Sequence, residues 1–108
     1  MAFDGQLAER IHSILKNENP VEKRMFGGIG YLINDNMACG VLGENLIVRV
    51  GKDHYAELIN HPSVKPFDLT GKAMNGWLEV LPSGTRDELE LSKWIQLGVV
   101  YARTLPPK

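Results

Sequence analysis

Hydrophobic positions follow a helical period at three places along the chain. In residues 3–16, apolar side chains recur at i, i+4, i+7 and i+8 from Leu7, which predicts an amphipathic helix with one buried side. Asp4 stands just before this stripe, where its carboxylate can accept hydrogen bonds from the free amides of a first turn. A short second helix is expected over residues 51–59. A third is expected over residues 86–103, and its apolar arc is wider than a single stripe.

Between the first two helices the pattern changes to short apolar runs. The stretch from Arg24 to Gly51 holds such runs separated by breaks of Asn, Asp and Gly. These residues tolerate positive φ, so the breaks favour tight hairpin turns. The pattern predicts an antiparallel meander with strands over residues 29–33, 37–42 and 46–50.

The rest of the chain supplies further extended segments. Strands are expected over residues 64–69 and 77–81, and Pro66 restricts the first of them to a sheet edge or an irregular strand. Residues 21–26 form either an edge strand or the lead-in to the meander. The element order α-β(3)-α-β(2)-α predicts one two-layer α+β domain over residues 1–108, with a five-stranded, mainly antiparallel sheet.

Apolar residues occupy both faces of the expected strands. Leu32 is followed by Ile33, and Ile47 by Val48, whereas a sheet with one solvated face alternates more cleanly. Two interpretations stay open. Either the last helix or a loop covers the second face, or that face is a surface for a partner or for a second copy of the chain.

Composition narrows the classes of function. The sequence has 108 residues, 44% of them hydrophobic, which suits one folded domain. A net charge of −1 argues against direct nucleic-acid binding, which depends on neutralising phosphates. We see neither a signal peptide nor an apolar run of membrane-spanning length, so we expect a cytoplasmic protein that contacts no membrane.

Few residues suggest catalysis. Cys39 is the only cysteine, and it is either a buried structural thiol or a reactive one, which would need a lowered pKa and a nearby base such as His54. The histidines have no metal-ligand spacing with one another or with the cysteine. We therefore expect no catalytic residues, no metal and no cofactor.

Two basic pairs flank the meander. Arg24 follows a lysine and precedes a glycine pair, and Arg49 is followed three residues later by Lys52. If the strand ends converge, these residues form a candidate site for an anion or an acidic partner. The alternative is that they form internal salt bridges or stay solvated. The candidate site comprises Arg24, Gly27, Gly28, Tyr31, Arg49 and Lys52.

Three segments carry a resemblance to a known family. They are Arg24-Met25-Phe26-Gly27-Gly28, the Met37-x-Cys39-Gly40 strand, and Gly71-x-x-Met74-x-Gly76-Trp77. With these segments, nearly the whole sequence is similar to the N-terminal domain of the TfoX/Sxy family. The resemblance implies the α-β(3)-α-β(2)-α fold shared with secretion-chaperone-like proteins, and it offers no established catalytic residues.

The resemblance also implies a role. Members of the family include bacterial regulators of natural competence, thought to help a cyclic-AMP receptor-type activator at particular promoters. Those regulators carry a C-terminal helical domain, and this sequence ends at Lys108 without one, so we expect a stand-alone N-terminal domain.

The expected function is a non-catalytic regulatory domain that binds a protein, such as a transcription activator, RNA polymerase or a second copy of itself. The alternative is a small-molecule or anion-binding domain with weak enzymatic activity.

Overall fold

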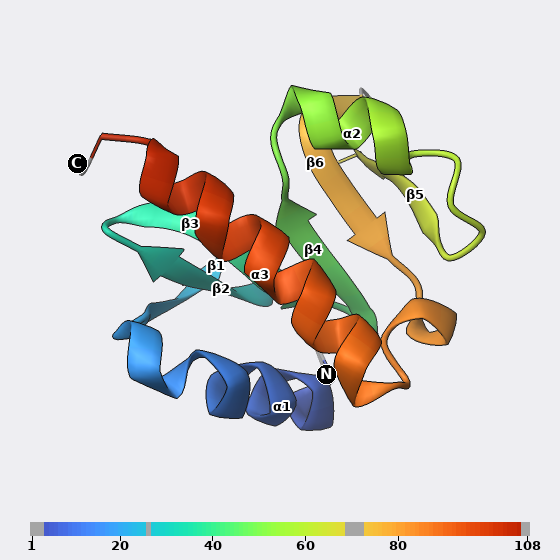
Figure 1. Cartoon of the computed structure of the whole chain (residues 1–108). Coiled ribbons are helices and arrows are strands. Elements are labelled where there is room, and N and C mark those ends of the chain that lie inside the picture. Colours follow the sequence, from blue (N-terminus) through green and yellow to red (C-terminus); the bar gives the residue numbers. More distant parts are fainter. Residues whose placement is uncertain (1–3, 26, 69–72, 107–108) are drawn as a thin grey trace.

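A computed structural model describes residues 4–25, 27–68 and 73–106 (Figure 1). Three α-helices and six strands follow one another, with two short 3-10 helices between them. The elements are α1 (Gly5–Leu15), η1 (Lys16–Glu18), β1 (Val21–Met25), β2 (Gly28–Ile33), β3 (Asn36–Leu42), β4 (Asn45–Arg49), α2 (Lys52–Leu58), β5 (Val64–Asp68), β6 (Ala73–Val80), η2 (Pro82–Gly84) and α3 (Glu88–Thr104).

The strands form one antiparallel sheet in the order β1-β2-β3-β4-β6-β5. This confirms the predicted α+β class and the meander, which continues from β1 through β4. The sheet has six strands rather than five, because Val21–Met25 pairs with residues 28–32 of β2 and is a true edge strand. β5 forms the other edge, and its register shifts between Pro66 and Asp68. This is expected because Pro66 has no backbone N–H to donate to a neighbouring strand.

All three helices lie on the same side of the sheet, with α3 between α1 and α2 (Figure 1). The buried core fills the space between them and the strands, and it includes Ile11 and Leu15 of α1 and Leu91 and Ile95 of α3. The first interpretation for the second sheet face was cover by the last helix or by a loop. Cover by the last helix is wrong, because α3 already packs on the first face.

A glycine sets how closely α3 approaches the sheet. A Cβ atom on Gly98 would lie 2.3 Å from the carbonyl oxygen of Ala38 in β3. Only a residue without a side chain fits so near another backbone. The helix therefore rests directly on the strand, and this contact fixes the position of its C-terminal half.

The second face of the sheet is largely apolar. Ile47 alternates with the core residues on either side of it, yet its side chain is only 3% exposed, and Phe67 is 6% exposed. A hollow of about 260 Å³ lies here, lined in part by Met37, Met74 and Trp77. These side chains shield one another, which explains why apolar residues occur on both faces of the strands.

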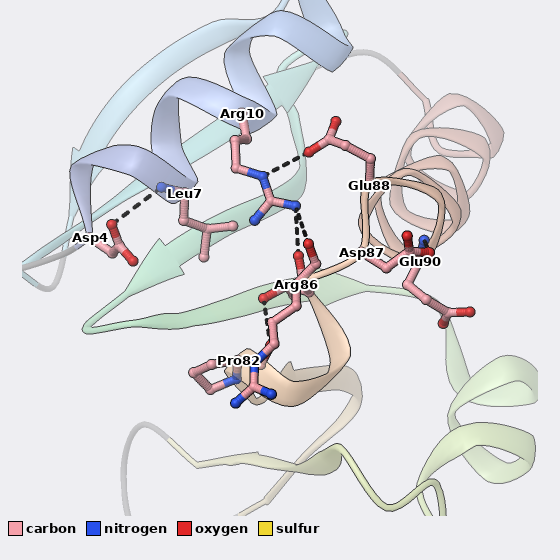
Figure 2. Close-up of polar contacts among 9 residues, drawn as sticks. Asp4, Leu7, Arg10, Pro82, Arg86, Asp87, Glu88 and Glu90 are labelled. Atoms are coloured by element: carbon pink, nitrogen blue, oxygen red, sulfur yellow. Dashed lines mark hydrogen bonds and ion pairs between the residues drawn. The ribbon is translucent and has the colours of Figure 1, made fainter.

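The helix ends follow the expected chemistry. Asp4 caps α1, since its Oδ1 accepts a hydrogen bond from the backbone amide of Gln6 at 2.9 Å. It also accepts one from the backbone amide of Leu7 at 3.3 Å (Figure 2). The third helix begins two residues later than predicted, with Asp87 as its cap. In the described part of the chain, no helix is long and apolar enough to cross a bilayer.

Candidate functional site

An apolar groove of about 640 Å³ runs between α2 and α3. On its α3 side, Leu89 is 72% exposed and Val100 is 60% exposed, although most large apolar side chains of the described residues are buried. We call this hollow the α2–α3 groove. It is lined by Val50, His54, Leu89, Ser92, Lys93, Gln96, Leu97, Val100, Tyr101 and Thr104.

A smaller polar hollow of about 200 Å³ adjoins the groove, and we call it the Arg49 recess. It lies where β4 ends and the chain turns into α2. Tyr101 lines both hollows, so they share one wall. The recess is lined by Arg49, Gly51, Lys52, Asn75, Gly76, Trp77 and Tyr101.

Two glycines build this turn. The backbone amides of Val50 and Gly51 both donate to the carbonyl oxygen of Gly76, at 2.8 and 3.1 Å. Gly51 has a φ of 85° and Gly76 a φ of 93°, a region that favours glycine. A Cβ atom on Gly51 would also lie 2.6 Å from the ring of Tyr101. The turn therefore brings β4, β6 and α3 together around one arginine.

Among the residues that the structure describes, Arg49 contacts two aromatic rings. Its guanidinium carbon lies 5.3 Å from the ring centre of Trp77 and 5.5 Å from that of Tyr101, within the range of cation–π attraction. Neither Arg49 nor Lys52 forms a hydrogen bond or ion pair with any residue that the structure describes. The rings thus hold the arginine while its N–H groups remain available to a ligand.

Comparison with known families gives one match that covers most of the chain. The TfoX N-terminal domain matches residues 14–102. The chain belongs to this family. Searches among curated proteins and among solved structures found no match. The match confirms the resemblance seen in the sequence. It includes every residue of the Arg49 recess and every residue of the α2–α3 groove except Thr104.

In this TfoX N-terminal domain the two basic pairs lie apart. Arg24 pairs with Ile29, which pairs with Val41, which pairs with Leu46. Arg24 is therefore level with the start of β4, whereas Arg49 is its last residue. The two strands are also three strand spacings apart, roughly 14 Å. The expected convergence of the basic pairs is not found, and only Arg49 and Lys52 meet.

The other members of the predicted anion site serve other parts of the domain. Tyr31 is 1% exposed, and its hydroxyl donates to the carbonyl oxygen of Ala8 in α1 at 3.0 Å. Burial, reinforced by the negative charge of Glu22, raises the pKa of Tyr31 to about 12. Gly28 lines the hollow on the second sheet face, and Gly27 forms the turn before it with a φ of 78°. None of the three lines the Arg49 recess.

Cys39 is sealed in the core. It is fully buried, and this burial raises the pKa of its thiol to about 12. The thiolate is the reactive form of cysteine, so the thiol is inert at neutral pH. Of the two interpretations of Cys39, the structure favours the structural one. His54, the base considered for it, lies on the surface of α2 and hydrogen-bonds Glu57 at 3.0 Å. Among the described residues, no three side chains of metal-ligand type form a group.

Sequence reasoning missed the residues that complete the two hollows. Trp77 and Asn75 come from β6, and Tyr101 from α3, all far along the chain from Arg49. One signal was present for the groove. The wide apolar arc of the last helix is more than the core needs, and the excess includes Leu89 and Val100. No local pattern marks the recess, because it depends on the pairing of β4 with β6.

Proposed function

We propose that this TfoX N-terminal domain is a non-catalytic regulatory domain that works by binding a protein, and that the α2–α3 groove is its contact surface. The observation that carries the proposal is the exposure of Leu89 and Val100 beside a groove of about 640 Å³. Both side chains line the same groove, and large exposed apolar patches usually mark interaction sites.

The shape of the groove suits a segment of another protein. One wall is α3, a helix of 17 residues held on the sheet, and the other is the short α2. A partner helix or extended segment can place apolar side chains between them, as in known helix-in-groove complexes. Membership of the TfoX family supports a regulatory role. By resemblance, we propose a transcription activator or an RNA polymerase subunit as the partner.

Side chains able to perform catalysis have local structural contacts, which supports a non-catalytic role. His12 hydrogen-bonds Glu22 at 3.0 Å on the surface, far from the groove in the chain. The ring nitrogen of His61 accepts from the backbone amide of Ser63 at 3.0 Å. Together with the burial of Cys39, these contacts give the two histidines and the cysteine a structural role.

Affinity capture with groove variants tests the proposal. Tagged wild-type protein, the double variant Leu89→Ser/Val100→Ser and the control Val21→Ser are exposed to the native lysate, and retained proteins are quantified by mass spectrometry. Val21 is a matched control because it is an exposed apolar residue, at 54%, on the edge strand β1. We expect a transcription activator or polymerase subunit on the wild type and the control, and its loss from the groove variant.

Two results would contradict the proposal. Equal retention of the same partner by all three proteins would place the contact outside the α2–α3 groove. Saturable turnover of a small substrate, abolished by one point substitution, would show that the domain is an enzyme instead.

A second candidate function is binding of a free small anion, and the uncommitted donors of Arg49 and Lys52 favour it. Acetate and phosphate are suitable probes in a thermal unfolding scan. A ligand present at 100 times its Kd stabilises a protein by roughly 2.7 kcal/mol, so a rise in melting temperature that disappears in Arg49→Met would support this function. The absence of any rise at high millimolar concentration would exclude it.

A further inference from the structure

We infer that the Arg49 recess receives a carboxylate of the partner segment while neighbouring apolar side chains of that segment occupy the α2–α3 groove. This inference rests on the proposed function, because it names the chemistry of the partner that the groove binds. The partner segment would carry an Asp, a Glu or a C-terminal carboxylate next to an apolar run.

The state of the arginine is the first argument. A guanidinium presents N–H groups in a planar fork that matches the two oxygens of a carboxylate. Arg10 donates to Glu88, and Arg103 donates to Glu18, so both are committed within the domain. Arg49 is instead oriented by Trp77 and Tyr101, which leave its donors unmatched. The N–H groups of this partly buried arginine can therefore donate to a carboxylate of a binding partner.

The charge of the surroundings is the second argument. The chain has 13 acidic and 12 basic residues, yet no Asp or Glu is among the described residues that line either hollow. The basic residues that do line them are Arg49, Lys52, Lys93 and His54. Glu57, on the same helix as His54, hydrogen-bonds that histidine at 3.0 Å. The two hollows together therefore complement a partner with negative charge and apolar surface.

The shared wall is the third argument. Tyr101 contacts Arg49 with its ring and also lines the groove. Val50, the next residue after Arg49, lies in the floor of the groove. A carboxylate at Arg49 is thus adjacent to the space for apolar side chains. A short peptide can reach both hollows at once, and this continuity favours a peptide over an isolated anion.

Peptide titration followed by NMR tests the inference. The probes are acetyl-Ser-Ala-Leu-Leu with a free C-terminal carboxylate, the same peptide with a C-terminal amide, acetyl-Ser-Glu-Leu-Leu-amide, and inorganic phosphate. The indole N–H of Trp77 reports on the recess, and the amide of Val100 reports on the groove. We expect saturable shifts at both positions with at least one carboxylate peptide, and about tenfold weaker binding, or none, for the neutral amide.

The first and third peptides distinguish the source of the carboxylate. Tighter binding of the free C-terminus indicates a chain end, whereas tighter binding of the glutamate peptide indicates an internal acidic residue, and either result supports the inference. Equal binding of the neutral and charged peptides overturns it. Shifts with phosphate alone overturn it as well. So does the absence of a saturable shift up to ~10 mM peptide, because a Kd above that concentration is weaker than the usual range of specific contacts.

Substitutions locate the effect. Arg49→Met and Lys52→Met should each weaken binding of the carboxylate peptide, the first by about tenfold or more. Arg86→Met is the matched control, since Arg86 is exposed and its loss changes the net charge equally. Lys52 is also exposed, so Lys52→Met remains informative if Arg49→Met lowers the unfolding midpoint. Unchanged affinity in both test variants, or an equal loss in Arg86→Met, would overturn the inference.

Failure of the inference and failure of the proposed function give different results. If Leu89→Ser/Val100→Ser loses the lysate partner while Arg49→Met keeps it, the groove binds a protein but the recess does not hold its carboxylate. If all variants keep the partner, the proposed groove contact itself fails. Loss of the partner in both supports the two proposals together.

Discussion

The two junctions that α3 makes with its neighbouring helices differ in how their polar groups are matched. At the α1–α3 junction, Arg10 donates to the carboxylate of Glu88 at 2.7 Å and to the carbonyl oxygens of Thr85 and Arg86 at 2.7 and 3.3 Å (Figure 2). At the α2–α3 junction an apolar groove stays open, and Arg49 at its end has no such acceptors in the described part of the chain. We call the first the closed junction and the second the open junction.

This difference separates a stabilising arginine from one available for binding. A buried polar group without a partner destabilises a fold, so arginines inside a domain are normally matched with acceptors. Arg10 follows that rule and fastens the start of α3 to α1. Arg49 is an exception to this rule. At the same junction Leu89 and Val100 are exposed, although large apolar side chains are usually buried. An arginine without acceptors among the described residues and two exposed apolar side chains are independent observations at one junction. Together they indicate that the open junction serves binding rather than stability.

The largest expected effect concerns two titratable groups of the core, Cys39 and Tyr31, at alkaline pH. The pKa of Cys39 is raised from 9.0 to about 12, and that of Tyr31 from 10.0 to about 12. The folded protein therefore keeps protons that the unfolded chain releases. Their contribution to stability is complete below pH 9 and is lost as pH rises from 9 towards 12. For Cys39 alone we expect a loss of roughly 2 to 3 kcal/mol by pH 11, at about 1.4 kcal/mol per unit of pKa shift.

Urea unfolding at pH 7, 9, 10 and 11 measures this effect, with Cys39→Ala as the control. Near neutral pH the variant is less stable because it loses buried atoms. The difference from the wild type should shrink as pH rises, since the variant has no thiol to ionise. Parallel stability curves from pH 7 to 11 would show that Cys39 titrates normally and that this region is open to water.

Replacing each arginine tests whether the two junctions differ in stability. Arg10→Met should lower the free energy of unfolding by about 2 kcal/mol, because hydrogen bonds to charged groups contribute roughly 1.5–3 kcal/mol. Arg49→Met should cost less than about 1 kcal/mol, since it loses only contacts with aromatic rings. Urea unfolding of both variants under identical conditions gives the two values. Similar costs would mean that Arg49 is as much a structural residue as Arg10.

The fold was predictable from sequence because its signals are local. Asp4 preceded a helical stripe and caps a helix, and Pro66 restricted β5 to an edge, where the structure places it. Val21–Met25 was harder to assign, since an edge strand with three consecutive charged residues has little hydrophobic pattern. Its pairing with β2 decides its conformation, and pairing cannot be seen within the segment.

The candidate site was predictable only in part, because it depends on the order and direction of strands. Arg49 and Lys52 are neighbours in the chain, so their meeting follows from sequence. Arg24 and Arg49 flank the same meander, but two strands lie between theirs and β1 runs opposite to β4. Trp77 reaches Arg49 only because β6, rather than β5, pairs with β4. Such long-range pairing leaves no mark on any single stretch of sequence.

A smaller effect distinguishes the two sides of α3 itself. Gly98→Ala places a Cβ atom 2.3 Å from the carbonyl oxygen of Ala38. Overpacking of this kind costs about 1–3 kcal/mol, against a gain of up to about 1 kcal/mol in helix propensity. We expect a net loss of about 1 to 2 kcal/mol by urea unfolding. Val100→Ala, two residues away on the open side, should change stability by less than about 0.5 kcal/mol. A stabilised Gly98→Ala variant would contradict the close approach of α3 to β3.

The smallest expected effect concerns the ion pair between Arg10 and Glu88. It distinguishes the contribution of this ion pair to the closed junction from that of the two backbone carbonyls. The side chain of Glu88 is 66% exposed and that of Arg10 is 32% exposed, and exposed ion pairs typically contribute about 0.2–1 kcal/mol. Glu88→Gln should therefore cost less than about 1 kcal/mol, and the cost should fade in 1 M salt, where the screening length is about 3 Å. The measurement is a double-mutant cycle with Arg10→Met at low and high salt.

A coupling energy above about 1 kcal/mol between Arg10 and Glu88 would mean that the ion pair, rather than the two backbone carbonyls, holds α3 to α1. Salt would then weaken the closed junction as well as any carboxylate bound at Arg49. If the coupling is small, as we expect, the two junctions respond differently to salt. The closed one keeps its stability because carbonyl acceptors carry no net charge, while binding at the open one declines. Salt would in that case separate the structural arginine from the binding one without any substitution.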